Sequence, residues 1–299
     1  MDSLFAGASI MSEPPKRKYK FTGETMEWEG RILHRIRRVS DGTLGGWIQS
    51  YCNLSQDGDC WVADEAKVYD SADIHGNAQV RDRAIVCSDA KVYDNAKVYG
   101  HARVYGYAEI HEHAQVYGHA QVFDDAIVCW HAKIYDNAYI YEQAMINGDA
   151  KIYGNAKVCG NSSIDAYVEV YDNAQVYGHT FIFDYAKISG YAKVYCEAKV
   201  HGKANILGDA QVYGKAQIFD QANVYGDAQV YGEAEVKDKA KIYGAAQVCG
   251  NAQVRDSAKV YEQAKVYGST KIASNALVYG HTIICDNSIV STDVKLGTK

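Results

Sequence analysis

The chain has 299 residues, with 37 acidic and 31 basic residues mixed along it and a formal net charge of −6. This mixture implies no domain-wide basic surface, so nucleic acid is not a favoured partner. No run of 18 apolar residues occurs, so we expect no membrane-spanning segment, and residues 1–20 lack the apolar run of a secretory signal. Eight cysteines without a Cys-x-x-Cys pair indicate reduced thiols, and we expect a cytoplasmic protein.

Residues 1–59 precede a long repeat and differ from it. Residues 1–17 contain both prolines and a basic cluster, and we expect them to be disordered. Residues 18–59 predict a small β-rich cap, since apolar and polar residues alternate from Arg31 to Val39 and Gly45-Gly46 suggests a tight turn before Trp47. An open end of a repeat structure exposes strand edges, so we expect the cap to cover it.

Residues 60–299 follow a six-residue repeat. Every sixth residue from Val62 to Leu296 makes 40 positions, and all are Val or Ile except the last. Two residues before these aliphatics, 32 of the 40 positions are Ala, and two residues after them, 30 of the 40 are Gly or Asp. The unit is therefore Ala-x-(Val/Ile)-x-(Gly/Asp)-x, repeated without insertion or deletion.

The spacing fits strands and excludes helices. A six-residue step turns a helix by about 600°, which would scatter the aliphatics around its axis. In a strand, Ala and Val/Ile point to one side, and Gly or Asp tolerates the left-handed backbone of a corner. The pattern therefore predicts an all-β fold, a single-chain, triangular parallel β-solenoid of about 13 coils with 18 residues each. Its interior should be packed with side chains and hold no cofactor.

The repeat resembles the hexapeptide-repeat left-handed β-helix family, except that Tyr often follows the aliphatic residue. The resemblance implies left-handed winding. The N-terminal residues are similar to the leader of bacterial and prophage hexapeptide-repeat proteins, some of which are labelled putative transferases. The similar residues are Lys18 to Thr25, Leu33 to Ile36, Leu44 to Ile48, Asn53 to Ser55, Gly58 and Trp61-Val62.

Tyrosine occupies 18 of the 40 outward positions directly after the aliphatic residue. Residues 18 apart stack on neighbouring coils, so these tyrosines predict ladders on two faces, while the third face carries mixed residues and should contact solvent. Such ladders stabilise a sheet through cross-strand pairs, or they form a contact surface. The candidate interface residues are Tyr99, Tyr117, Tyr135, Tyr153, Tyr171, Tyr225, Tyr243, Tyr261 and Tyr279 on one face, and Tyr177, Tyr195, Tyr213 and Tyr231 on a second.

A histidine-rich corner is the candidate metal site. One full coil of the repeat separates His111 from Cys129 and His113 from His131, so the four side chains should flank one corner on two adjacent coils. These ligand types suit zinc, although exposed corners accept any polar residue.

A column of cysteines shares a face with the second set of tyrosines. Its members are two or more coils apart, too far for disulfides between them, and we interpret them as small outward substitutes for tyrosine. They are Cys87, Cys159, Cys249 and Cys285.

The preferred interpretation is a non-enzymatic structural or binding solenoid whose tyrosine faces associate with a second copy or with another protein. The resemblance implies two alternatives. One is a hexapeptide-type acyltransferase, for which the corner of His111, His113 and His131 is the only candidate site. The other is a phage accessory protein that binds a host factor. A general base needs a pocket and an orienting partner, and the sequence names neither.

Overall fold

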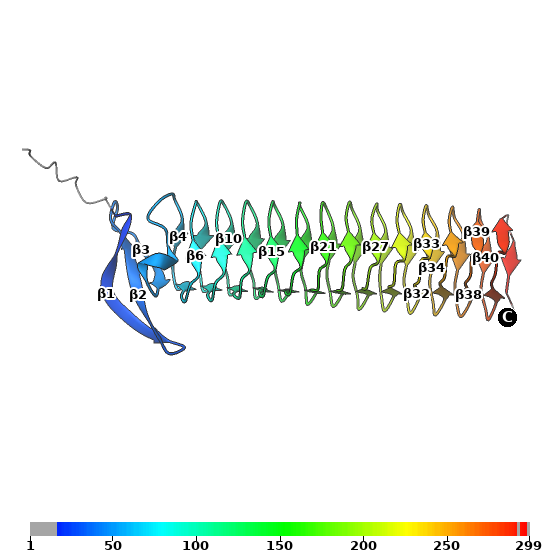
Figure 1. Ribbon diagram of the computed structural model, residues 1–299, viewed down its shortest axis with the longest axis horizontal. Helices are drawn as coiled ribbons and strands as arrows, with labels where there is room; N and C mark the ends of the chain where they lie inside the picture. The colour runs from blue at the N-terminus through cyan, green and yellow to red at the C-terminus, as the bar shows by residue number, and fades with distance from the viewer. Residues whose placement is uncertain (1–16, 292–293, 298–299) are drawn as a thin grey trace, which may run out of the picture.

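The computed structural model describes residues 17–291 and 294–297. These residues form a long β-solenoid with a β-hairpin at its N-terminal end (Figure 1). Within them there is no α-helix and one three-residue 3-10 helix, η1 (Tyr51–Asn53). The all-β solenoid expected from the repeat is therefore confirmed. The disordered segment expected at residues 1–17 lies outside the described residues, apart from Arg17.

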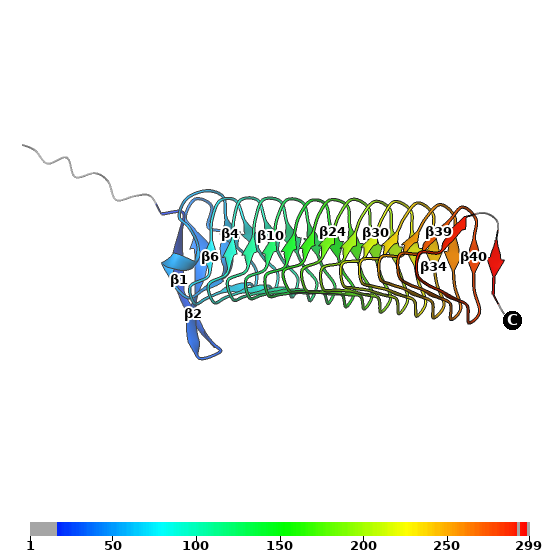
Figure 2. The ribbon, with the colours of Figure 1, turned by 45° about the vertical axis from the view of Figure 1, so that its right-hand side comes forward.

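The solenoid strands recur every six residues along the described chain. Each of the strands from β4 (Trp61–Val62) to β43 (Lys295–Leu296) contains one outward residue and the inward aliphatic that follows it. Two strands are longer by one residue, β39 (Lys271–Ala273) and β42 (Ile289–Ser291). The strands form three parallel sheets, and Figure 2 shows their coils stacked in register.

The three sheets define three outward surfaces. Face 1 is the outward side of the 16-stranded sheet, which begins β1-β2-β3-β5 and ends at β41 (Ile283–Ile284). Face 2 belongs to the 14-stranded sheet from β4 to β43, and face 3 to the 13-stranded sheet from β6 (Asp73–Ile74) to β42. The register is constant, because each strand residue pairs with its equivalent in the next coil, as where β10 (Lys97–Val98) pairs with β13 (Gln115–Val116).

The interior consists of the alanines and branched aliphatics of the repeat. Ala138, Ile140 and Val158 are fully buried, as are nearly all of their equivalents. Burial of each aliphatic side chain contributes roughly 1.5–3 kcal/mol, and the backbone of each coil donates to the next, as where Lys97 N–H bonds Ala114 O at 2.9 Å. The interior is therefore a packed core, as expected.

The backbone conformation at the corners explains why glycine or an acidic residue usually stands there. From Asp64 to Asp286, the second residue after each aliphatic has a positive φ, for example 63° at Gly148 and 53° at Asp94. Where this residue is acidic, its carboxylate in most cases accepts a hydrogen bond from the N–H one coil ahead: Asp94 from Glu112 at 3.3 Å, and Glu112 from Trp130 at 2.5 Å. Glycine supplies only the backbone conformation, whereas Asp and Glu also satisfy a donor.

The cap begins with the antiparallel hairpin β1 (Tyr19–Trp28) and β2 (Arg31–Arg38), followed by β3 (Leu44–Ile48). Strand β3 pairs in parallel with β5 (Lys67–Val68) of the solenoid. Trp47 N–H and Gln49 N–H bond carbonyls of the first coil at 2.9 and 3.1 Å. The cap thus pairs part of the strand edge at the N-terminal end.

Gly45 and Gly46 lie inside β3 and not in the tight turn that we expected. A Cβ on Gly45 would stand 2.8 Å from the Val62 carbonyl oxygen, and one on Gly46 would stand 2.7 Å from the Ala66 carbonyl oxygen. The glycines are required because the cap approaches the first coil this closely. The Gly-Gly pair marks close packing, which a short sequence pattern cannot distinguish from a turn.

Candidate binding surface formed by the tyrosine ladders

Face 2 carries two runs of stacked tyrosines, as the spacing predicts. Neighbouring ring centroids lie 4.8–5.3 Å apart and the ring planes agree within 15°. Ser189 and Leu207 separate the runs, and all nine rings are half-buried. The first run is Tyr99, Tyr117, Tyr135, Tyr153 and Tyr171, and the second is Tyr225, Tyr243, Tyr261 and Tyr279.

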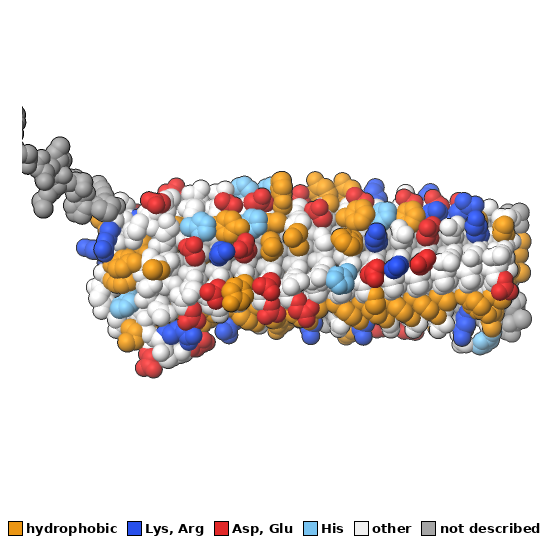
Figure 3. Space-filling model, viewed as in Figure 1, with side chains coloured by type: hydrophobic (Ala, Val, Ile, Leu, Met, Phe, Trp, Pro, Cys, Tyr) orange, Lys and Arg blue, Asp and Glu red, His pale blue; other side chains and the backbone are white. Residues whose placement is uncertain are grey.

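Face 1 carries the second ladder, with the four tyrosines expected, and also a separate aromatic stack. Tyr177, Tyr195, Tyr213 and Tyr231 stack at 4.8–4.9 Å. A further stack of Tyr105, Phe123 and Tyr141, with spacings of 4.8 and 5.1 Å, lies nearer the N-terminus on the same face. Because Phe123 stands between the two tyrosines, a pattern of tyrosine alone does not reveal this stack, whereas any aromatic residue that recurs one coil later does. A continuous hydrophobic band runs along the lower edge of the molecule in Figure 3, where Figure 1 labels strands of this sheet.

The ladder hydroxyls are polar contacts at the outer rim. Tyr99 Oη donates to Gln115 Oε1 at 3.2 Å and Tyr195 Oη to Gln211 Oε1 at 3.4 Å, in both cases one coil ahead. Loss of solvation raises the pKa of Tyr135 to about 12. The phenol therefore stays protonated near neutral pH and can donate a hydrogen bond to a partner.

The hairpin covers the first part of face 1. Met26, Trp28 and Leu33 of β1 and β2 belong to an apolar cluster with Trp47 of β3 and with four solenoid residues, Tyr69, Ile85, Cys87 and Tyr105. Under this cover Tyr69 is only 1% exposed and Cys87 only 7%. A β-hairpin docked on face 1 therefore buries the residues of this face that lie beneath it.

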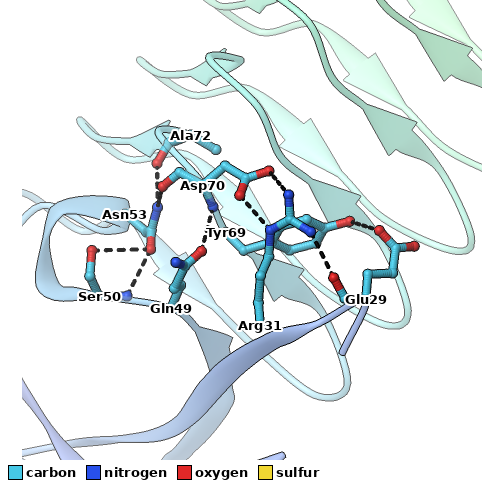
Figure 4. A network of polar contacts seen from close by, with 8 residues as sticks. All are labelled: Glu29, Arg31, Gln49, Ser50, Asn53, Tyr69, Asp70 and Ala72. Carbon is cyan, nitrogen blue, oxygen red and sulfur yellow. Dashed lines mark hydrogen bonds and ion pairs between the residues drawn. The ribbon is translucent and has the colours of Figure 1, made fainter. Parts of the chain in front are cut away.

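Polar contacts hold the hairpin tip on the solenoid (Figure 4). Tyr69 Oη donates to Glu29 Oε2 at 2.8 Å, and Arg31 pairs with both carboxylate oxygens of Asp70, one of them at 3.0 Å. Arg103, two coils from Tyr69, also lies 3.8 Å from Glu29. The contact thus combines apolar packing with an acidic and a basic group of the hairpin.

The histidine corner does not form the expected cluster. His113 and His131 stack at 5.1 Å, whereas His111 stacks on Tyr93 at 4.8 Å on face 3. Cys129 is buried, its thiol bonds the Asn147 side chain at 2.8 Å, and burial raises its pKa to about 11, which disfavours the thiolate that a metal needs. In residues 17–291 and 294–297, no group of three His, Cys, Asp or Glu side chains is placed to hold a metal ion.

The same corner was the candidate transferase site. His113 and His131 border a groove of about 280 Å³ that Lys97, Lys133 and Asp149 also line, while His111 lies away from it. Among the described residues, the two imidazoles stack on each other and no hydrogen bond orients either ring. The geometry therefore gives no general base with an orienting partner.

Exposed aromatic residues at the corners were not anticipated. Tyr107, Trp130, Tyr167, Tyr185 and Tyr191 are all more than half exposed, and Tyr167 and Tyr185 stack at 5.0 Å. The four tyrosines occupy the variable position just before the inward alanine or its equivalent, whereas Trp130 occupies the Gly/Asp position and has a φ of 57°. The sequence indicates them as aromatic residues that lie outside the position directly after the aliphatic residue, where tyrosine regularly occurs.

Face 3 has mixed chemistry, with short aromatic stacks that the sequence analysis did not list. Phe183, His201 and Phe219 stack at 4.6 and 5.0 Å. Burial lowers the pKa of His201, so this imidazole is neutral near pH 7. The face therefore has aromatic stacks, but they are shorter than those of face 2.

No protein-family model matches the chain, and a search of curated proteins finds no match either. In the part of the chain that the structure describes, no helix has the length and apolar character needed to cross a membrane.

Proposed function

We propose that the chain is a non-enzymatic structural scaffold that binds protein surfaces through its tyrosine ladders, first of all a second copy of itself through face 2. The supporting observation is the long, regular array of half-buried rings on a flat face. Aromatic arrays with hydroxyls at the rim combine apolar area with hydrogen-bonding capacity, which is the composition of protein interfaces.

The charges of face 2 determine how this association depends on salt. Between Lys97 and Lys259, its outward strand positions carry six lysines and one acidic residue. This residue, Glu169, pairs with Lys187 at 3.0 Å and lies 3.6 Å from Lys151. Two copies that meet face to face bring these lysines together, and like charges oppose the contact. Association through the rings should therefore strengthen as salt screens the repulsion. The six lysines are Lys97, Lys133, Lys151, Lys187, Lys241 and Lys259.

The test is particle mass against concentration, measured by sedimentation velocity with negative-stain images of the same samples. The expected result is a species heavier than the 33.0 kDa chain, more abundant at about 500 mM than at about 50 mM salt. Replacing Tyr117, Tyr135 and Tyr153 by Ser should return it to the monomer without loss of strand content.

The matched control removes three aromatic residues from face 3 instead, as Tyr93→Ser, Phe183→Ser and Phe219→Ser. This variant should associate like the parent chain. A monomer at every concentration and at both salt levels would refute self-association. Loss of the fold in the face 2 variant alone would show that the ladder serves stability only.

The finer implications of the family resemblance stay predictions. They are left-handed winding, a prophage origin with binding of a host factor, and the transferase alternative. The cytoplasmic location, expected from the cysteines, also stays a prediction. A bound acyl donor in a mass spectrum of the purified protein would support the transferase.

A further inference from the structure

Face 1 contains the same arrangement three times. In each, a cysteine takes the place of an aromatic ring, with a tyrosine one coil before and one coil after it. Because the thiol is much smaller than a phenol, it leaves a gap in the stack, which we call a notch. The notches are Tyr69-Cys87-Tyr105, Tyr141-Cys159-Tyr177 and Tyr231-Cys249-Tyr267.

The first notch is occupied by the chain's own hairpin. Met26, Trp28 and Leu33 pack around Tyr69 and Cys87 and bury them almost completely. The second and third notches have no such cover within the described residues, and Tyr141, Cys159 and Tyr177 are only partly buried.

The second notch also has an acidic residue at the position that Asp70 holds at the first. Asp70, which follows Tyr69 and binds Arg31 of the hairpin, corresponds to Glu142, which follows Tyr141. Glu142 borders a hollow of about 540 Å³ that also contains Tyr107, Asp124 and Asp125. A guanidinium from a docked hairpin would meet carboxylates here, as Arg31 does at the first notch.

A carboxylate would also find partners at the second notch. Lys157 occupies the position 16 residues after Tyr141, which is the relation that places Gln121 next to the Tyr105 hydroxyl at 3.4 Å. Lys157 and the Tyr141 hydroxyl thus offer a cation and a donor, the two kinds of group that Arg103 and Tyr69 offer to Glu29. Lys157 lies one coil from Tyr141, whereas Arg103 lies two coils from Tyr69, and the residue equivalent to Arg103 here is Gln175. A hydrogen bond with Cys159 raises the pKa of Tyr141, so its hydroxyl keeps its proton.

The charges of face 1 favour an acidic group in the partner. The outward strand positions of this face, from β5 to β41, hold five basic residues and no acidic residue. The hairpin places a carboxylate of its own, that of Glu29, on the covered part of this face. Face 1 is therefore electrostatically complementary to a hairpin with an acidic side chain. The five basic residues are Lys67, Arg103, Lys157, Lys193 and Lys265.

From this correspondence we infer that the second notch, Tyr141-Cys159-Tyr177, is the docking site for a β-hairpin of a partner protein. The hairpin places an apolar side chain over Cys159, a carboxylate against Tyr141 and Lys157, and a guanidinium against Glu142. The inference extends the proposed function from face 2 to face 1. It rests on one part of that proposal, namely that the aromatic ladders bind protein. A second copy is not the favoured occupant, because its own hairpin is already held by Asp70 and Tyr69.

The probe is a head-to-tail cyclised peptide with the sequence of residues 24–35, labelled with a fluorophore and titrated with the full chain by anisotropy. We expect saturable binding that weakens as salt rises from about 50 to about 500 mM. Cys159→Tyr fills the notch with a ring and should weaken binding about tenfold or more. Lys157→Glu reverses the attracting charge and should also weaken it. Cys285→Tyr, a matched change near the end of the same face, should leave binding unchanged.

Three results would overturn the inference. One is full binding to both Cys159→Tyr and Lys157→Glu, with melting curves showing that the variants are folded. The second is no binding to the parent chain. The third is binding that Arg31→Ala strengthens and Cys159→Tyr leaves unchanged, because the peptide would then be replacing the chain's own hairpin in the first notch.

The two proposals fail separately. The face 2 variant with three serines should bind the peptide normally, since it leaves face 1 intact. Self-association should in turn survive Cys159→Tyr. The opposite salt dependence of the two reactions distinguishes them further.

Discussion

The cap and the solenoid are stabilised in different ways. In the cap, single side chains make contacts that occur once: buried Asn53 donates to the carbonyls of Asp70 and Ala72, each at 2.9 Å, and accepts from Ser50 N–H. In the solenoid, one set of contacts recurs in every coil, and each coil touches mainly its neighbours. The solenoid therefore distributes its stability over many equivalent positions, whereas the cap concentrates it in a few.

Alkaline pH acts on many coils together and should have the largest effect. Loss of solvation raises the pKa of Tyr93, Tyr135 and Tyr195 from 10.0 to about 12. Unfolded phenols ionise near pH 10, so the folded chain binds more protons between about pH 10 and 12. The contribution to stability is complete below pH 10 and is lost as pH rises to about 12.

The measurement is the free energy of unfolding in guanidinium chloride at about pH 8, 10 and 11.5, with tyrosinate absorbance recorded on the same samples. Ladder tyrosines that ionise near pH 10 without loss of stability would contradict this account.

Placing a charge in the solenoid interior should have the next largest effect. Ile140 of β17 (Tyr139–Ile140) is fully buried among aliphatics. Ile140→Asp leaves a carboxylate without a partner and should cost more than about 4 kcal/mol, measured by denaturant unfolding. The control is Tyr139→Asp in the same strand, which points outward and should cost about 1 kcal/mol or less. A similar loss of unfolding free energy in both variants would contradict the assignment of Ile140 to the interior and Tyr139 to the surface.

Removing the central amide of the cap should have a smaller effect. Asn53→Ala leaves two buried carbonyls without their donor and should cost about 2 kcal/mol. Asn77, which bonds the Asn95 side chain at 3.2 Å on the exposed surface of the solenoid, is the matched control. Asn77→Ala should change the free energy of unfolding by about 0.5 kcal/mol or less. An equal loss in both variants would mean that the cap does not concentrate stability as described.

The repeat made most of the fold predictable. The six-residue period decides which side chains point inward, and the length of one coil decides which outward residues stack, so Tyr117 and Tyr135 could be placed on each other from numbering alone. The prediction succeeded because the contacts are periodic and each coil repeats the last.

The cap and its docking contact could not be predicted in this way. Arg31 and Asp70 are 39 residues apart and meet only because the hairpin folds back over face 1. No period links them, and the same holds for Trp28 and Lys67, whose ammonium lies 4.3 Å from the indole ring centre. The prediction that the cysteines share a face with tyrosines is confirmed. That Cys87 leaves space for the hairpin could not be predicted, because the contact depends on how the hairpin folds back.

The unbroken register has a consequence for distance along the molecule. Cys87 and Cys159 are four coils apart and Cys159 and Cys249 are five coils apart, so at about 4.8 Å per coil they lie roughly 19 and 24 Å from each other. Because every coil has the same height and no residue is inserted, the axial distances between these cysteines are fixed. A duplication or deletion of one coil between two of them would change their distance by about 4.8 Å, so the molecule works as a molecular ruler.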